Sequence, residues 1–135
     1  MIKRVHHIAI AVKSLDESIP VFEKLLGVKA KVTGVPCQRV TEALFKIDEG
    51  VEINLVEPMG PDSTVASFLE KKGEGLHHIA LEVDDINGEL ASMEQRGFRL
   101  IDKEGREGVA GQIGFLHPKS AAGVLVELVE PREHE

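Results

Sequence analysis

The sequence predicts an α+β fold made of two tandem modules, each with the element order βαβββ. Two observations predict this fold. First, residues 5–12 read VHHIAIAV and residues 76–83 read LHHIALEV. Second, EINLVEP at residues 52–58 resembles VELVEP at residues 126–131. Two similarities that occur in the same order in both halves indicate a duplicated module.

A helix is expected after the first strand of each module. In both halves the apolar residues there recur at positions i, i+4 and i+7, which places them on one face of an amphipathic helix. These residues are Leu15, Ile19 and Phe22 in the first half, and Ile86, Leu90 and Met93 in the second. Gly27 and Gly97 follow, where a glycine in the left-handed conformation would end each helix.

The start of the first helix carries two conflicting signals. Ser14 and Glu17 have the spacing of a capping box. Pro20 would then lie in the second turn, where proline removes a backbone hydrogen bond. We therefore expect the helix to start nearer Asp16 or Glu17.

The remaining elements are predicted from apolar runs bounded by turn residues. The predicted strands span residues 5–12, 28–35, 39–47 and 51–57 in the first module, and 76–83, 98–102, 112–117 and 123–130 in the second. Ser63 is placed to cap a short helix over residues 64–71, which Gly73-Glu74-Gly75 would end. We expect a single domain over residues 1–135, with module 1 at about 1–60, a linker helix at about 63–72 and module 2 at about 75–135.

Composition excludes some classes of function. The 135 residues suit one compact domain, and 42% of them are hydrophobic, which is enough to form its core. The net charge of −7 argues against a sequence-independent grip on nucleic acid, which requires a basic face. Cys37 is the single cysteine, so an intramolecular disulfide is impossible, and we expect an inert thiol. Because neither a signal peptide nor a long apolar run is visible, we expect a cytoplasmic protein that contacts no membrane.

Strand alternation indicates where a site could lie. His7 and His78 each point to the face of their strand that otherwise carries small or polar residues. The large aliphatic residues of both strands point to the opposite face, which a helix would cover. The neighbouring His6 and His77 have that opposite parity, so we leave them out of the site.

The duplication pairs four residues that could hold a divalent metal ion. If a pseudo-twofold axis relates the modules, His7 faces His78, and Asn54 faces Glu127. Two imidazoles, a carboxylate and an amide oxygen would leave open positions on such an ion. For each histidine alone, a satisfied core residue is the simpler interpretation. Glu127 favours the metal, because a buried carboxylate between Leu and Val residues needs a cation.

Three segments together run through nearly the whole chain: VHHIAIAVKSLDES, EPMGPDSTVASFLEKKGEGLHHIALEVDDI and GFLHPKSAAGVLVELVEP. In these segments the chain resembles the vicinal oxygen chelate superfamily and, within it, the methylmalonyl-CoA epimerases. The resemblance implies that the paired βαβββ modules curl into a half-barrel around a divalent metal. It also implies that His7, His78 and Glu127 are metal ligands and that Asn54 occupies the fourth ligand position, where relatives carry Gln or Glu. Because asparagine is shorter than glutamine, its contact with the metal could run through a water molecule.

The resemblance implies an isomerase that interconverts (R)- and (S)-methylmalonyl-CoA through an enolate. A divalent metal would stabilise this enolate, and we expect cobalt, with zinc, manganese or nickel as alternatives. Glu42, in QRVTEALF, matches one catalytic glutamate of the family, and Glu127 corresponds to the other. Without the resemblance, Glu42 would be interpreted as a solvated residue. By analogy with the family, we also expect a homodimer.

Coenzyme A needs positive charge to hold its phosphates. Lys119, in the run HPKSAAG, is the predicted contact, and Arg39, Lys103 and Arg106 are further candidates. An exposed loop lysine without a ligand is an equally good interpretation of Lys119.

Three other functions fit parts of the pattern. A glyoxalase I-like lactoylglutathione lyase also transfers protons at a metal, but we would expect a carboxylate in place of Asn54. An extradiol dioxygenase would use two histidines and one carboxylate with iron, but this chain is short for that class and its second-half motifs do not fit. A non-catalytic, bleomycin-resistance-like binding protein would leave the presence of His7, His78 and Glu127 unexplained.

Overall fold

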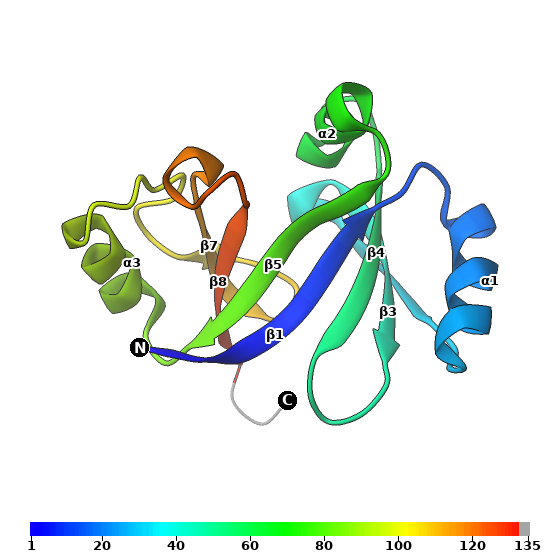
Figure 1. Ribbon diagram of the computed structural model, residues 1–135, viewed down its shortest axis with the longest axis horizontal. Helices are drawn as coiled ribbons and strands as arrows, with labels where there is room; N and C mark the ends of the chain where they lie inside the picture. The colour runs from blue at the N-terminus through cyan, green and yellow to red at the C-terminus, as the bar shows by residue number, and fades with distance from the viewer. Residues whose placement is uncertain (133–135) are drawn as a thin grey trace. The chain divides into compact units, whose positions relative to one another are not determined.

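The structure, a computed structural model, describes residues 1–132. Figure 1 shows their strands and helices. In chain order the elements are β1 (Ile2–Ala11), α1 (Leu15–Leu26), β2 (Lys31–Val35), η1 (Pro36–Gln38), β3 (Val40–Lys46), β4 (Glu52–Pro58), α2 (Thr64–Lys72), β5 (Gly75–Val83), α3 (Ile86–Gln95), β6 (Arg106–Glu107), β7 (Gly111–Leu116), η2 (Pro118–Ser120) and β8 (Val126–Pro131). The elements η1 and η2 are short 3-10 helices. The order βαβββ therefore occurs twice, which confirms the predicted α+β duplication.

In the first module the strands lie in the order β2-β3-β4-β1. β1 and β4 are parallel, with Ala9 beside Asn54 in their register. β3 is antiparallel to β4 on one side and to β2 on the other. Antiparallel neighbours can be joined by a tight turn, whereas a parallel pair requires a crossover that usually contains a helix. α1 supplies the helix between β1 and β4.

The second module repeats this arrangement with the strand order β5-β8-β7-β6. β5 and β8 are parallel, and Ala80 lies beside Glu127 in their register. β7 is antiparallel to both β8 and β6. Because Ala9 and Ala80 are equivalent positions of the repeat, Asn54 and Glu127 occupy equivalent positions in the two modules.

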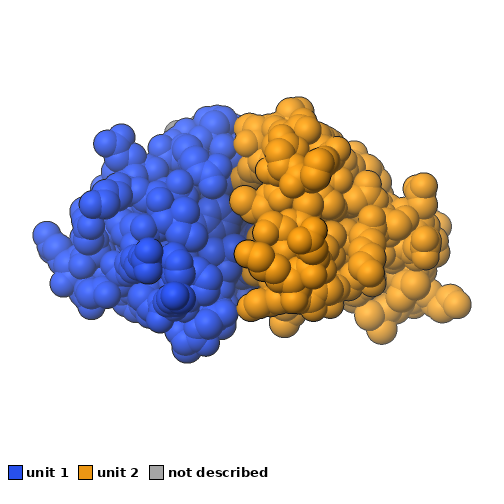
Figure 2. Space-filling model, turned by 90° about the horizontal axis from the view of Figure 1, so that it is seen from above, with its two compact units in different colours: residues 1–6, 78–135 blue, residues 7–77 orange. Residues whose placement is uncertain are grey.

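The chain divides into two compact units (Figure 2). Unit 2 comprises His7–His77, and unit 1 comprises Met1–His6 with His78–Glu135. The first residues of β1 therefore lie in the same compact unit as most of the second module, and the predicted bounds of the two modules stay a prediction. Two ion pairs within unit 1 join the start of β1 to the end of β5 and the residues after it. These pairs are Arg4 with Glu82 at 2.7 Å and Lys3 with Asp84 at 3.0 Å. The last three residues of the predicted second module, 133–135, lie outside the described residues.

α1 begins at Leu15, so the expectation of a later start near Asp16 or Glu17 is wrong. Ser14 is the N-cap, and its side chain accepts a hydrogen bond from the backbone N–H of Glu17. Pro20 lies inside the helix and is exposed. At an exposed position, water can satisfy the carbonyl group that loses its helical partner, which lowers the cost of the proline. The predicted end is confirmed, because Gly27 adopts the left-handed conformation with φ of 76°.

The apolar faces predicted for α1 and α3 pack into the cores of their own modules. Phe45 and Leu55 are completely buried in the core that includes the apolar face of α1. Leu116 and Leu128 lie in the corresponding core with the apolar face of α3. The helical periodicity therefore identified the side chains that anchor both helices, and this anchoring fixes the strands that carry the candidate site.

A glutamate at the end of each module's last strand holds the first turn of that module's helix. Leu15 N donates to Glu57 Oε1 at 2.6 Å, and Ile86 N donates to Glu130 Oε1 at 2.9 Å. The first N–H groups of a helix have no partner within the helix, so these carboxylates satisfy donors that would otherwise require water. A negative charge is also favoured at this end by the helix dipole. The duplication thus extends to the contacts that orient each helix.

α2 follows the predicted start, because the Ser63 side chain accepts a hydrogen bond from Val65 N at 3.1 Å. Val65 is buried and packs in one cluster with Ala11 and Val56. α2 therefore packs over Ala11 on this face of β1. No helix among residues 1–132 is long and apolar enough to cross a membrane.

One predicted strand does not form. Within residues 98–102, Leu100 makes an isolated bridge to Leu116 in place of a continuous ladder. Phe115 explains the irregularity, because its carbonyl accepts from Ile101 N at 2.8 Å and its N–H donates to the Asp102 side chain at 2.9 Å. The Asp102 side chain thus accepts the hydrogen bond from Phe115 N that a backbone carbonyl would accept in a regular strand pair. The two-residue strand β6 was not predicted, since two residues are too few to show alternation.

Candidate functional site

His78 on β5 and Glu127 on β8 form a polar pair within the second module, in which Glu127 is buried and His78 is partly buried. His78 Nε2 lies 2.9 Å from Glu127 Oε1, and the Glu127 side chain is only 6% exposed. Phe115 lies opposite Glu127 in the register of β7 and β8. Its ring meets the His78 ring edge-on, with centroids 5.5 Å apart. The imidazole of His78 therefore contacts a carboxylate and an aromatic ring, which restrict its orientation.

The first module places Asn54 and Glu42 together at a second buried polar pair. Asn54 Nδ2 donates to Glu42 Oε2 at 3.4 Å. Both side chains are buried, as is His7 on the adjacent strand β1. Glu42 is therefore a core carboxylate, and the interpretation of Glu42 as a solvated residue is wrong. Asn54 Oδ1 is buried and has no hydrogen-bond partner among residues 1–132, so it is an acceptor whose partner is not a described protein group.

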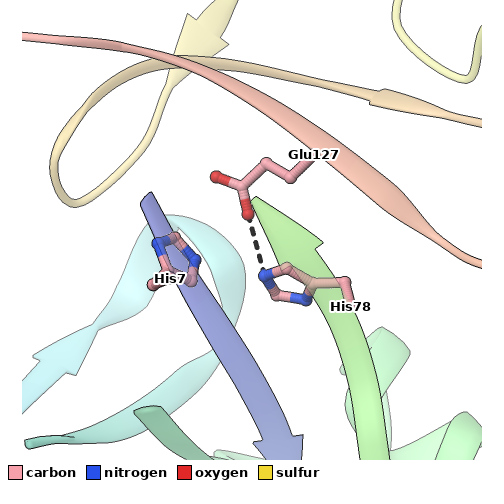
Figure 3. Close-up of side chains that lie close together, drawn as sticks. All are labelled: His7, His78 and Glu127. Carbon is pink, nitrogen blue, oxygen red and sulfur yellow. Dashed lines mark ion pairs between the residues drawn. The ribbon is translucent and has the colours of Figure 1, made fainter. Parts of the chain in front are cut away.

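His7, His78 and Glu127 form a group that could hold a metal ion (Figure 3). Each offers one ligand atom, and these three atoms lie within 4.8 Å of one another. Two imidazole nitrogens and one carboxylate oxygen are donors that divalent transition metals accept. A buried carboxylate also gains from a nearby cation, because burial without charge compensation is costly. The donor set of these three residues therefore fits a divalent metal ion.

The four cations considered for coenzyme A differ in their partners. Three of them form ion pairs with acidic residues. These pairs are Arg39 with Asp62 at 3.1 Å, Lys103 with Glu94 at 3.4 Å and Arg106 with Asp102 at 3.0 Å. The hydrogen bond from Arg39 holds the pKa of Asp62 below its ordinary value. Lys119, in η2, is exposed and forms no ion pair with the described part of the chain, so its charge remains available to a ligand.

The sequence interpretation missed Phe115 and its contacts. The Arg106 guanidinium lies over the Phe115 ring, 5.7 Å from its centroid, and Arg106 is in turn paired with Asp102. Asp102 also accepts from Phe115 N. These contacts hold the Phe115 ring that packs against His78, and no single sequence motif indicates them. The signal that could have revealed it is the alternation in GQIGFL, which places Phe115 on the face that carries Glu127.

Comparison with known proteins gives one consistent result. Residues 6–116 match the model of the Glyoxalase/Bleomycin resistance protein/Dioxygenase superfamily. The mitochondrial methylmalonyl-CoA epimerase of Homo sapiens is 36% identical over 93% of this chain and 72% of its own length. The ethylmalonyl-CoA/methylmalonyl-CoA epimerase of Cereibacter sphaeroides is 34% identical over 95% of this chain and 98% of its own.

A solved structure extends the similarity to three dimensions. A variant of Streptomyces coelicolor methylmalonyl-CoA epimerase in complex with 2-nitronate-propionyl-CoA matches with a TM-score of 0.92 at 35% identity. The match covers 98% of this chain and 97% of the other. This similarity confirms the predicted vicinal oxygen chelate fold.

Proposed function

This chain belongs to the methylmalonyl-CoA epimerase family within the glyoxalase/bleomycin resistance/dioxygenase superfamily, and we propose that it interconverts (R)- and (S)-methylmalonyl-CoA. The observation that carries the proposal is the group His7, His78 and Glu127, which combines metal-ligand donors in a chain of this family. Proteins of the superfamily fold do not share one chemistry, so the proposal depends on the site residues as well as on the fold.

The reaction requires two proton transfers at one carbon. A base on one face of the substrate removes the α-proton, so that a C–H bond breaks, an O–H bond forms on the base and the electron pair delocalises into the thioester carbonyl. An acid on the other face then returns a proton to the same carbon, and the carbonyl is restored. A divalent metal bound at His7, His78 and Glu127 would supply electrophilic stabilisation of the enolate oxygen.

Glu42 is the proposed base for one face. Its carboxylate is buried, and electrostatic interactions with a base in a water-poor site are stronger than in bulk water. Glu127 is the proposed base for the other face and would also be a metal ligand. A base that serves both faces of one planar enolate would have to move around it, so two carboxylates at different positions suit the reaction better.

The remaining roles are proposed on weaker support. Lys119 is exposed and forms no ion pair with residues 1–132, which supports its proposed contact with a coenzyme A phosphate. For Asn54, the partnerless Oδ1 supports the proposed fourth ligand position. Cobalt as the native metal, the homodimer and the cytoplasmic location stay predictions from the sequence.

The proposed function is tested by turnover before and after metal removal. Purified protein should epimerise methylmalonyl-CoA, lose this activity when a chelator removes the metal and regain it with cobalt, manganese or zinc. Metal analysis should find about one divalent ion per chain, because the chain has a single donor group of this kind among its described residues. Full activity in metal-free protein, or no turnover with metal present, would contradict the proposal.

A further inference from the structure

Asn54 and Glu42 are diagonal neighbours on one face of the β3–β4 pair. In the register of these strands Leu44 lies opposite Asn54, and Glu42 lies opposite Val56. Side chains two residues apart along a strand point to the same face, so diagonal neighbours are within reach of longer side chains. The hydrogen bond from Asn54 Nδ2 to Glu42 Oε2, at 3.4 Å, is the contact that results.

Both partners of this bond are withdrawn from water. Asn54 is 2% exposed and Glu42 is 7% exposed. A buried carboxylate needs hydrogen-bond donors, because its desolvation is not otherwise repaid. An amide nitrogen is a donor, whereas a carboxylate or an aliphatic side chain at position 54 would offer Glu42 no proton. The amide nitrogen of Asn54 therefore stabilises the Glu42 carboxylate, whichever group binds the amide oxygen of Asn54.

We propose that Asn54 is a positioning residue that holds the Glu42 carboxylate in the orientation needed to meet the substrate α-proton. The proposal rests on the proposed function, because it assigns Asn54 a role in only one of the two proton transfers. It also gives a reason for an asparagine in this chain where a carboxylate would serve a metal better. An acidic side chain at position 54 would put a second negative charge against Glu42.

The two possible roles of Asn54 differ in which face of the substrate they affect. A group that acts through the metal changes the stabilisation of the enolate, which both proton transfers share. A group that acts through Glu42 changes the transfer on one face and leaves the other unchanged. The ratio of the exchange rates of the two enantiomers therefore separates positioning from metal binding.

The test measures deuterium incorporation at the α-carbon of each pure enantiomer in deuterated water, with cobalt-loaded protein. Glu42→Gln identifies the enantiomer that Glu42 serves, because the exchange of that enantiomer should be lost. Asn54→Asp has the same size as the native residue and keeps an oxygen for the metal, but it cannot donate to Glu42. Asn87→Asp is the matched control, since Asn87 is exposed and its Oδ1 accepts from Gly105 N, a contact that aspartate retains. Cobalt binding to each protein is measured by calorimetric titration.

Asn54→Asp should lower the exchange of the Glu42-served enantiomer by about ten- to a hundred-fold relative to the other enantiomer, the effect expected when a reacting group is misplaced. Its cobalt affinity should equal or exceed that of the wild type, and Asn87→Asp should leave the ratio unchanged. An equal loss for both enantiomers, or an unchanged ratio, would overturn the positioning role. Wild-type protein that exchanges neither enantiomer would instead contradict the proposed function itself.

Discussion

The two modules share a backbone plan but differ in the polar side chains that this plan presents. Asn54 and Glu127 occupy equivalent positions, beside Ala9 and Ala80 in the two parallel strand pairs. The amide of the first module contacts a glutamate on the next strand, whereas the carboxylate of the second contacts His78. The duplicated backbone therefore presents polar groups at the same place in both modules, but these groups have different partners.

The two modules differ most on the strand next to these positions, which is β3 in the first module and β7 in the second. Glu42 lies opposite Val56 in the first module, and Ile113 lies opposite Val129 at the equivalent place in the second. Ile113 is 1% exposed and packs in the core with Val129 and Ala80. The second module thus fills with hydrocarbon the position where the first buries a carboxylate. At this pair of equivalent positions the carboxylate is in the first module, which suits a single additional base.

The largest effect is expected from removal of the second module's carboxylate. Glu127→Gln should lose most bound metal together with nearly all epimerase activity, because a neutral amide is a weaker ligand and a poor base. Activity should fall by at least the roughly 10²–10⁴-fold that loss of a positioned base costs. Metal content by elemental analysis and turnover are measured on the same sample. Glu104→Gln, at an exposed position, is the control for the change of charge. Wild-type metal content in Glu127→Gln would remove Glu127 from the ligand set and weaken the contrast between the modules.

A smaller and symmetric effect is expected where the modules are alike. Glu57→Ala and Glu130→Ala should each lower the free energy of unfolding by about 1 kcal/mol, because each removes a cap from the first turn of one helix. Urea denaturation measures this loss. Glu57→Gln and Glu130→Gln keep an acceptor oxygen and should recover most of the stability. A cost at only one of the two positions would show that the modules differ in these helix contacts as well.

The sequence predicted the features that depend on local pattern. The repeated VHHIAIAV and LHHIALEV segments, the apolar faces of α1 and α3 and the two histidines all follow from periodicity and parity. Errors arose where the environment of a residue decided the outcome. Pro20 is tolerated in α1 because it is exposed, and residues 98–102 fail to form a strand because the Asp102 side chain takes a backbone partner.

The contact between Asn54 and Glu42 illustrates what the sequence could not supply. The two residues are on adjacent strands, and whether they meet depends on the register that the β3–β4 turn sets. A shift of one residue would turn Glu42 to the opposite face. Family resemblance identified both residues as important, but it said nothing of their contact, because the asparagine is a departure from the family pattern.

The most direct test of the account is the behaviour of Glu42→Gln in folded, metal-loaded protein. Glutamine keeps the size of the side chain and an acceptor oxygen for Asn54, but it cannot take up the α-proton. We expect epimerisation to fall by about 10²–10⁴-fold while metal content stays at the wild-type level and one enantiomer still exchanges its α-hydrogen with deuterated water. Glu49→Gln, in the exposed turn between β3 and β4, should leave all three properties unchanged. Wild-type epimerisation by metal-loaded Glu42→Gln would contradict the assignment of a base to the first module.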